Sequence, residues 1–327
     1  MSRLILPPWL SPESLASRGD AVAVMAKSME RLQQADRSYF ADLRGYETLV
    51  VGSDYGGEHK GATHEVIAVR IAGLADVVGA EAARAVFRRR FLRDGRRMAY
   101  KNLSDRRRRA ALVPFLQLSG ETPGVVFVVL IARTIRSVFQ PADGLEVQEL
   151  LPNWKASVIE KAMRVMHIVS LLLAGFSRRM QDVLWVTDED AIVANENRHR
   201  TFVETFARIS SHYLTHSLRH LRVASTSSDP GNRSLEDFVA LPDLVAGTVA
   251  DVYRAPISKI GSSDLIVPLP GAAPRKLRPI VRWLADDAKP MRTVVLVVDE
   301  GPGGSHRVRL LRLHANGDER WWSPHLG

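Results

Sequence analysis

Hydrophobic residues along this chain follow two periods that together predict an α/β fold. Apolar positions at helical spacing predict helices over residues 11–38, 81–92, 104–118, 154–176 and 191–218, and a further helix beginning at Pro242. Short apolar runs bounded by turn residues predict strands over residues 46–51, 65–71, 124–132, 182–187, 220–224, 293–299 and 306–314, and residues 238–241 lead into the last helix. The alternation of the two kinds of element indicates a mixed sheet flanked by helices.

Two of these segments predict how the sheet is built. The Gly-rich segment 55–61 lies between the first two predicted strands and favours an antiparallel hairpin. Residues 124–132 are continuously apolar, which is typical of a central strand covered on both faces. With the helix and strand that follow, this segment predicts a right-handed parallel crossover.

The chain divides into three predicted parts. Residues 1–45 form an N-terminal helical extension, with its helix lying at the periphery of the domain. Residues 46–256 form the core. Beyond Arg254 the composition shifts toward Pro, Gly and basic residues, which predicts a small C-terminal α+β appendage over residues 257–327. Ser104 is the expected N-cap of its helix.

Composition and charge narrow the classes of function. The 327 residues are 46% hydrophobic and 25% charged, as in ordinary globular proteins. The absence of cysteine excludes disulfides, thiolate zinc sites and thiol nucleophiles. A formal net charge of +9 makes nucleic acid the first partner to consider. The N-terminus lacks a secretory signal pattern, and the most apolar segment, Val165–Phe176, is too short to span a bilayer, so we expect a cytoplasmic protein without membrane association.

Three aspartates occupy positions that suit a metal site. Asp54 ends the first predicted strand, Asp188 directly follows the strand at residues 182–187, and Asp243 lies in the predicted first turn of the last helix. Carboxylates at strand ends and on a neighbouring helix are the ligands that Mg²⁺ or Mn²⁺ needs for phosphodiester chemistry. The order of the acids along the chain therefore favours a nuclease.

The same order of elements resembles the ribonuclease H-like superfamily. More narrowly, the chain is similar to a largely uncharacterised bacterial branch whose first strand ends in Asp-Glu-Ser-Gly and whose last helix opens with Leu-Ala-Asp-Leu. The corresponding residues here are Ser53-Asp54-Tyr-Gly-Gly57 and Leu241-Pro-Asp243-Leu-Val-Ala-Gly247. The similarity covers about residues 46–254.

The resemblance implies one or two Mg²⁺ or Mn²⁺ ions and hydrolysis of DNA or RNA. Asp54 would be the ligand shared by the metals, Asp188 and Asp243 would complete the shell, and Lys101 would pair with the scissile phosphate or with an acid of the cluster. Glu189 or Asp190 would be a neighbouring ligand. For the remaining acid the spacing does not choose among Glu58, Glu65 and Glu81.

Each aspartate also has an explanation that needs no metal. Asp54 suits a turn before Gly56, Asp188 suits a helix N-cap, and Asp243 suits the positive end of a helix dipole. In addition, the bacterial branch often carries Glu-x-Lys before its first long helix, whereas this chain has Ala99-Tyr-Lys101. The alternative hypothesis is therefore a catalytically inactive protein of the same fold that binds nucleic acid or acts as a scaffold. Its oligomeric state is open, with a homodimer as one option.

A basic tract runs from Arg84 to Arg109, with twelve Lys or Arg residues and only two acids. Such a segment can follow a nucleic-acid backbone independently of base sequence, although it also suits a solvated helix face. The predicted contacts to nucleic acid are Arg88, Arg89, Arg90, Arg93, Arg96, Arg97 and Arg106–Arg109.

The histidines give two weaker signals. His212, His216 and His220 recur at four-residue spacing on one predicted helix, which would form a stripe able to bind metal or phosphate. His59 and His64, in the first hairpin, are candidates for protonating a leaving group.

Overall fold

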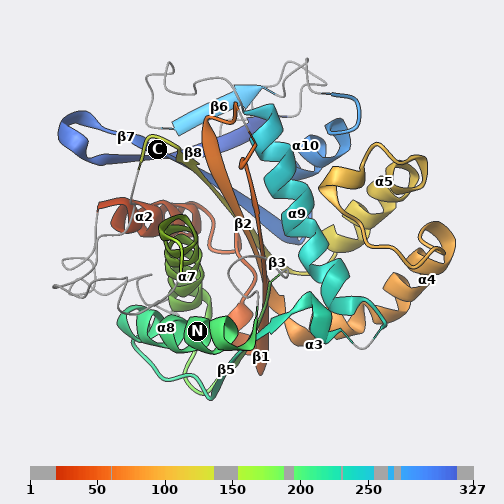
Figure 1. Ribbon diagram of the computed structural model, residues 1–327, viewed down its shortest axis with the longest axis horizontal. Coiled ribbons are helices and arrows are strands. Elements are labelled where there is room, and N and C mark those ends of the chain that lie inside the picture. Colours follow the sequence, from red (N-terminus) through yellow and green to blue (C-terminus); the bar gives the residue numbers. More distant parts are fainter. Residues whose placement is uncertain are drawn as a thin grey trace.

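One mixed sheet lies between two layers of helices. The computed structural model describes residues 20–59, 61–135, 154–187, 195–229, 231–253, 264–268 and 274–314. Within them, the sheet has eight strands (Figure 1). In spatial order they are β5 (His220–Ser225), β4 (Asp182–Thr187), β1 (Thr48–Gly56), β2 (His64–Gly73), β3 (Gly124–Ala132), β7 (Met291–Glu300), β8 (His306–His314) and β6 (Asp264–Pro268). The expected α/β class is confirmed.

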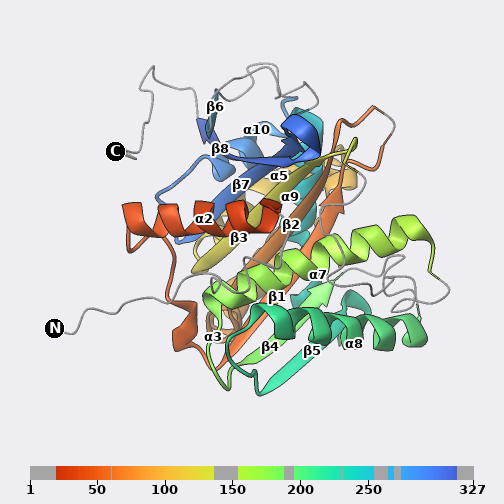
Figure 2. The same cartoon turned by 90° about the vertical axis from the view of Figure 1, so that its left-hand side faces the viewer.

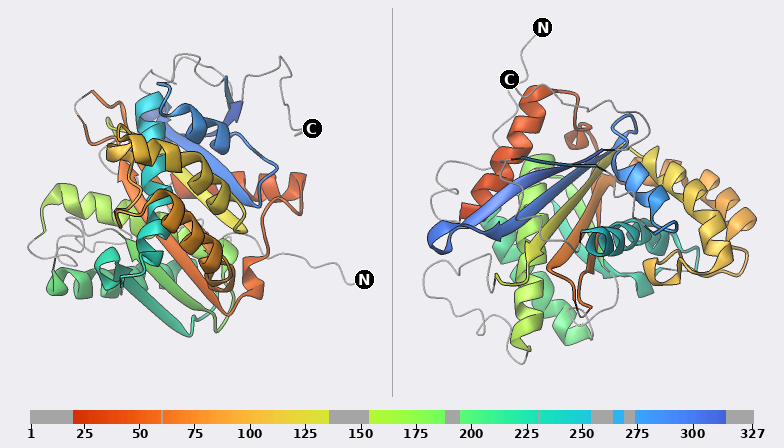
Figure 3. Two further views of the ribbon diagram at one scale, coloured as in Figure 1. Left: turned by 90° about the vertical axis from the view of Figure 1, so that its right-hand side faces the viewer. Right: turned by 90° about the horizontal axis from the view of Figure 1, so that it is seen from above.

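The two faces of the sheet carry different sets of helices. One face is covered by α2 (Asp20–Ala35), α7 (Ala156–Phe176) and α8 (Glu196–Tyr213) (Figure 2). The other is covered by α3 (Leu74–Gly79), α4 (Glu81–Phe91), α5 (Arg106–Gly120), α9 (Ser234–Val252) and α10 (Arg278–Leu284) (Figure 3). Short 3₁₀ turns are η1 (Leu43–Gly45), η2 (Tyr100–Asn102), η3 (Thr226–Ser228) and η5 (Pro302–Gly304). Strand β3 is buried on both faces, as its unbroken apolar run predicts.

The pairing of the strands brings several strand ends to one edge of the sheet. Strands β1 and β2 form the expected antiparallel hairpin, and β2 is also antiparallel to β3. Strand β4 runs parallel to β1, and β7 runs parallel to β3. The carboxyl ends of β1, β3, β4 and β7 therefore meet at the same edge. The crossover through α7 joins the parallel strands β3 and β4, with β1 and β2 lying between them.

The C-terminal strands continue this sheet instead of forming a separate appendage. Strand β7 pairs with β3 from Gly124 opposite Met291 to Ile131 opposite Val298. Because β3 is apolar on both faces, leaving it as an exposed edge would create an aggregation-prone strand, and β7 removes that edge. The N-terminal helix α2 is likewise part of the core, since Met25 and Met29 are fully buried.

Helix α9 begins eight residues earlier than the sequence predicts. It starts at Ser234, so residues 238–241, which were expected to precede the helix, are helical, and Pro242 lies inside the helix. The Asp229 carboxylate accepts hydrogen bonds from the backbone N–H groups of Arg233 and Leu235, which satisfies donors at the helix start. Burial of a long apolar face compensates for the N–H group that Pro242 lacks.

Two other helix ends also differ from expectation. The N-cap of α5 is Asp105, whose side chain accepts from the N–H of Arg108, so Ser104 does not cap this helix. Helix α8 ends at Tyr213, where the apolar face that packs on α7 ends.

Helix α9 packs unusually close to β1, and two glycines make this approach feasible. A Cβ atom on Gly52 would lie 2.8 Å from the Phe238 ring, and one on Gly56 would lie 2.7 Å from the carbonyl oxygen of Ala246. Both distances are shorter than a van der Waals contact between a Cβ atom and another carbon or an oxygen atom. The glycines on either side of Asp54 are therefore a packing requirement of the fold.

We predict that Gly56→Ala lowers the free energy of unfolding by about 1–3 kcal/mol, because the new methyl group meets helix backbone that cannot rotate away. The matched control is Gly79→Ala, where no atom lies within 4 Å of the added Cβ. Urea unfolding of both variants measures the difference. Equal free energies of unfolding for the two variants would contradict the prediction, because they would show that α9 can move away from β1 with little loss of stability.

Candidate functional site

Asp54 and Asp243 lie on facing surfaces of β1 and α9. Residues two apart on a strand share a face, so Asp54 points to the same side as Gly52 and Gly56, the side that contacts α9. On α9, Asp243 lies one turn from Val239, which contacts Gly52, and one turn from Ala246, which contacts Gly56.

This placement corrects two details of the sequence interpretation. Asp54 lies inside β1, which continues to Gly56, and it is not the last residue of the strand. Asp243 lies near the middle of α9, so a helix dipole at the first turn does not explain it. Packing of α9 on β1 puts both acids on the sides of these elements that meet.

The backbone holds both carboxylates in position. Oδ1 of Asp54 accepts a hydrogen bond of 2.6 Å from the N–H of Tyr55. Oδ2 of Asp243 accepts one of 2.7 Å from the N–H of Tyr100, in η2. Both side chains are partly exposed.

Tyr100 contacts α9 along two turns of the helix. Its hydroxyl donates to Asp251, while its ring covers Gly247 so closely that any side chain at that position would overlap it. Nε2 of His59, from the β1–β2 loop, lies 3.8 Å from Asp251. Sequence reasoning missed Tyr100 and Asp251; the eight-residue spacing of Asp243 and Asp251 on one helix face was the available signal.

Lys101 follows Tyr100 in η2 and is exposed. The contact that fixes η2 to α9 is made by Tyr100, whose N–H donates to Asp243, so Lys101 is held next to that contact by its neighbour in the chain.

The three glutamates considered as an additional ligand each have a basic partner elsewhere. Glu58 pairs with Lys161 at 2.8 Å, and Glu65 pairs with Arg164 at 2.6 Å on the α7 side of the sheet. Glu81 forms a bidentate pair with Arg84, and these hydrogen bonds lower the pKa of the Glu81 carboxyl group. Glu65 lies on the opposite face from Asp54, which excludes it from a shared site.

Asp188, Glu189 and Asp190 lie outside the described residues. Within the described ranges, no group of three or more acids or histidines is placed to hold a metal ion. Asp54 and Asp243 are thus the two predicted ligands whose positions are known.

The basic tract divides into inward and outward residues. Arg88 donates two hydrogen bonds to the buried carboxylate of Asp237, and Arg84 donates another. Arg108 is buried and donates to the carbonyl oxygen of Arg97. Arg88 therefore joins α4 to α9, which corrects its assignment as a nucleic-acid contact. The exposed members are Arg89, Arg90, Arg93, Arg96, Arg106, Arg107 and Arg109, while Arg97 is half-buried.

The predicted histidine stripe does not form, because α8 ends before two of its members. His212 is in the last turn of α8, His216 lies 3.0 Å from the Ser177 hydroxyl, and His220 begins β5 and contacts Asp182. His64 is buried against Asp299, at 3.2 Å, so it is not available as a proton donor to a leaving group at the surface.

Comparisons with known proteins add no assignment: no family model matches the chain, and no curated protein matches its sequence. Across the described residues, no helix has both the length and the apolar character needed to cross a membrane.

We predict that Tyr100→Phe lowers the free energy of unfolding by about 1–2 kcal/mol, because the Asp251 carboxylate loses a hydrogen bond from the hydroxyl group. Thermal unfolding measures the loss. If the two side chains stabilise the protein as a pair, Asp251→Asn in the Tyr100→Phe background should lower the free energy of unfolding only slightly further. Fully additive effects would contradict that coupling.

Proposed function

We propose that this protein is a divalent-metal-dependent nuclease of ribonuclease H-like fold that hydrolyses phosphodiester bonds in DNA or RNA. The observation that carries the proposal is the placement of Asp54 and Asp243 on facing surfaces of β1 and α9. Carboxylate oxygens from two packed elements are the ligands that a hard divalent cation prefers.

The order and direction of the elements support the fold. A hairpin is followed by helices, strand β3, helix α7, strand β4, helix α8, strand β5 and the terminal helix α9, which is the order that underlies the sequence resemblance. Asp54 is near the carboxyl end of β1, the end of parallel strands where ligands usually bind in α/β proteins.

The proposed site combines these two aspartates with residues assigned from sequence alone. Asp188 is included because it directly follows Thr187 in the chain. Thr187 of β4 pairs with Ser53 of β1, the residue just before Asp54. Glu189 is its neighbour in the chain. When bound, Mg²⁺ or Mn²⁺ would activate water and stabilise the leaving oxygen. Lys101 would pair with a substrate phosphate, and exposed arginines of α4 and α5 would hold the nucleic-acid backbone.

We predict that the purified protein cuts DNA or RNA with Mg²⁺ or Mn²⁺, and that Asp54→Asn and Asp243→Asn each lower the rate at least a hundredfold. Both variants remove charge from the ligands while keeping the shape of the side chain. The matched control is Glu204→Gln, an exposed acid on α8 at the other side of the sheet. A gel assay with labelled single-stranded and double-stranded substrates measures cutting. Asp54→Asn protein that cuts at the wild-type rate would exclude the proposed site.

The second candidate function is a catalytically inactive protein that binds nucleic acid. The observation that favours it is that Tyr100 donates hydrogen bonds to two of the acids on α9. Its backbone N–H donates to the Asp243 carboxylate, and its hydroxyl donates to the Asp251 carboxylate. A calorimetric titration with Mn²⁺ separates the two candidates, because only the nuclease should show metal binding that Asp54→Asn abolishes.

Both candidates predict salt-dependent binding through the exposed arginines. Replacing Arg106 and Arg107 with Gln should weaken binding to nucleic acid. It should also reduce the slope of the logarithm of the association constant against the logarithm of salt concentration by about 2, because each phosphate contact on duplex DNA contributes roughly 0.9. The control with the same change in charge replaces Arg200 and Arg208, both exposed on α8. Fluorescence anisotropy at several salt concentrations measures the slopes. Equal slopes in the two double variants would locate the binding surface away from α5.

A further inference from the structure

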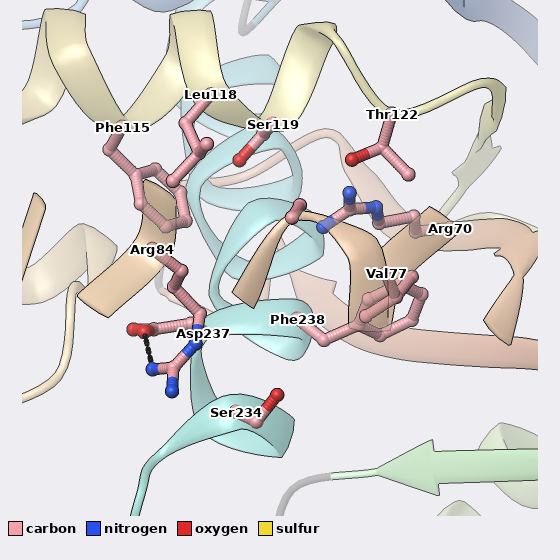
Figure 4. Close-up of a pocket in the computed structure, with 11 residues that line it drawn as sticks. Arg70, Val77, Arg84, Phe115, Leu118, Ser119, Thr122, Ser234, Asp237 and Phe238 are labelled. Carbon is pink, nitrogen blue, oxygen red and sulfur yellow. Dashed lines mark hydrogen bonds and ion pairs between the residues drawn. The ribbon is translucent and has the colours of Figure 1, made fainter. Parts of the chain in front are cut away.

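A small pocket lies between α3, α4, α5, the start of α9 and strand β2 (Figure 4). Its volume is about 40 Å³, compared with the roughly 10–15 Å³ that one water molecule needs by the same measure. Neither Asp54 nor Asp243 lines it. Polar side chains in its wall are Arg70, Arg84, Ser119, Thr122, Ser234 and Asp237.

Arg70 is the unusual member of this wall. Only 4% of its surface is exposed, and its guanidinium lies 4.3 Å from the centre of the Phe238 ring. Its Nε is buried without a hydrogen-bond partner among the described residues. Figure 4 shows the guanidinium extending into the pocket near Thr122. Burial lowers the pKa of Arg70 to about 9, which reflects a charge that no carboxylate stabilises.

The acid in the pocket wall, Asp237, and the neighbouring Glu81 of α4 are already paired with other arginines. Asp237 accepts hydrogen bonds from Arg84 and Arg88, and Glu81 pairs with Arg84. The guanidiniums of Arg70, Arg84 and Arg88 outnumber the two carboxylates. The charge of Arg70 is therefore not neutralised by either of them. An unpaired buried cation is costly, and a bound anion would supply the missing charge.

The remaining wall residues suit an oxyanion. Ser119 and Thr122 are each 6% exposed, and their hydroxyl groups can donate hydrogen bonds. A guanidinium next to hydroxyl donors fits a phosphate, which has several acceptor oxygens and takes two parallel hydrogen bonds from arginine.

We propose that this pocket is a phosphate-binding site in which Arg70 is the charged ligand and the hydroxyls of Ser119 and Thr122 are additional donors. The phosphate is either a free small molecule or the terminal phosphate of a nucleic-acid strand. The site is independent of the proposed catalytic aspartates, so Asp54→Asn should leave phosphate binding unchanged.

The test is calorimetric titration of the full-length protein with inorganic phosphate at neutral pH and constant ionic strength. We expect saturable binding to the wild type, at least tenfold weaker binding to Arg70→Met and weaker binding to the double variant Ser119→Ala, Thr122→Val. Arg222→Met, which removes an exposed arginine on β5, should bind as the wild type does. Without phosphate, Arg70→Met should melt at the same or a higher temperature than the wild type, because it removes a buried unpaired charge.

Several outcomes would overturn the proposal. They are the absence of saturable binding to the wild type, unchanged binding in Arg70→Met, or acetate binding as tightly as phosphate. If Arg70→Met fails to fold, unchanged binding in the double hydroxyl variant overturns it instead. Oligonucleotides with and without a 5′-phosphate identify the source: an Arg70-dependent preference for the phosphorylated strand assigns a nucleic-acid end, and equal binding assigns a free phosphate compound.

Discussion

The close packing of α9 on β1 is the contact on which the rest of the structure depends. It requires a strand with no side chain at positions 52 and 56 and a helix that presents Phe238 and Ala246 at those points. Because the intervening residue on that face of the strand is Asp54, the same packing places an acid against the helix. The fold thus buries an apolar helix and positions a polar pair through a single interface.

A second contact joins the peripheral helices to α9. Asp237 is buried at the start of α9 and receives hydrogen bonds from Arg84 and Arg88 of α4. The hydrogen bonds from Arg84 to Glu81, and then the one from Arg84 to Asp237, raise the pKa of Arg84 above its ordinary value. Breaking a buried pair by removing one member leaves an uncompensated charge, which is far more costly than losing a surface pair. Part of the basic tract is therefore structural, and only its outward residues are available to a polyanion.

The sheet also shows why the C-terminal segment belongs to the core. Strand β3 is covered on both faces by helices and is paired on both edges, by β2 and by β7. Removing the last strands would expose backbone groups of the most apolar strand in the chain. The segment after Arg254 looks different in composition because its Pro-rich and Gly-rich parts lie between the strands.

Much of the secondary structure could be predicted from the sequence because it depends on local patterns. Short apolar runs bounded by turn residues located β1 and β2, the unbroken run located β3, and helical spacing located α4 and α7. Errors occurred where a hydrogen bond or a strand pairing that the apolar pattern does not encode decides the outcome. Asp229 starts α9 before the point that Pro242 suggests, and β7 joins a sheet edge that is remote in the chain.

The candidate site divides in the same way. The sequence by itself identified Asp54 and Asp243 as candidate ligands, because with Asp188 they occur in order at strand ends and on the last helix. Only the tertiary structure decided that β1 and α9, which carry them, pack together, that Glu65 lies on the opposite side of the sheet and that Arg88 is bound to Asp237. Tyr100 and Arg70 could not be recognised from sequence, because their roles come from contacts with α9. Residue type determines which chemistry is available, but long-range packing determines which residues meet.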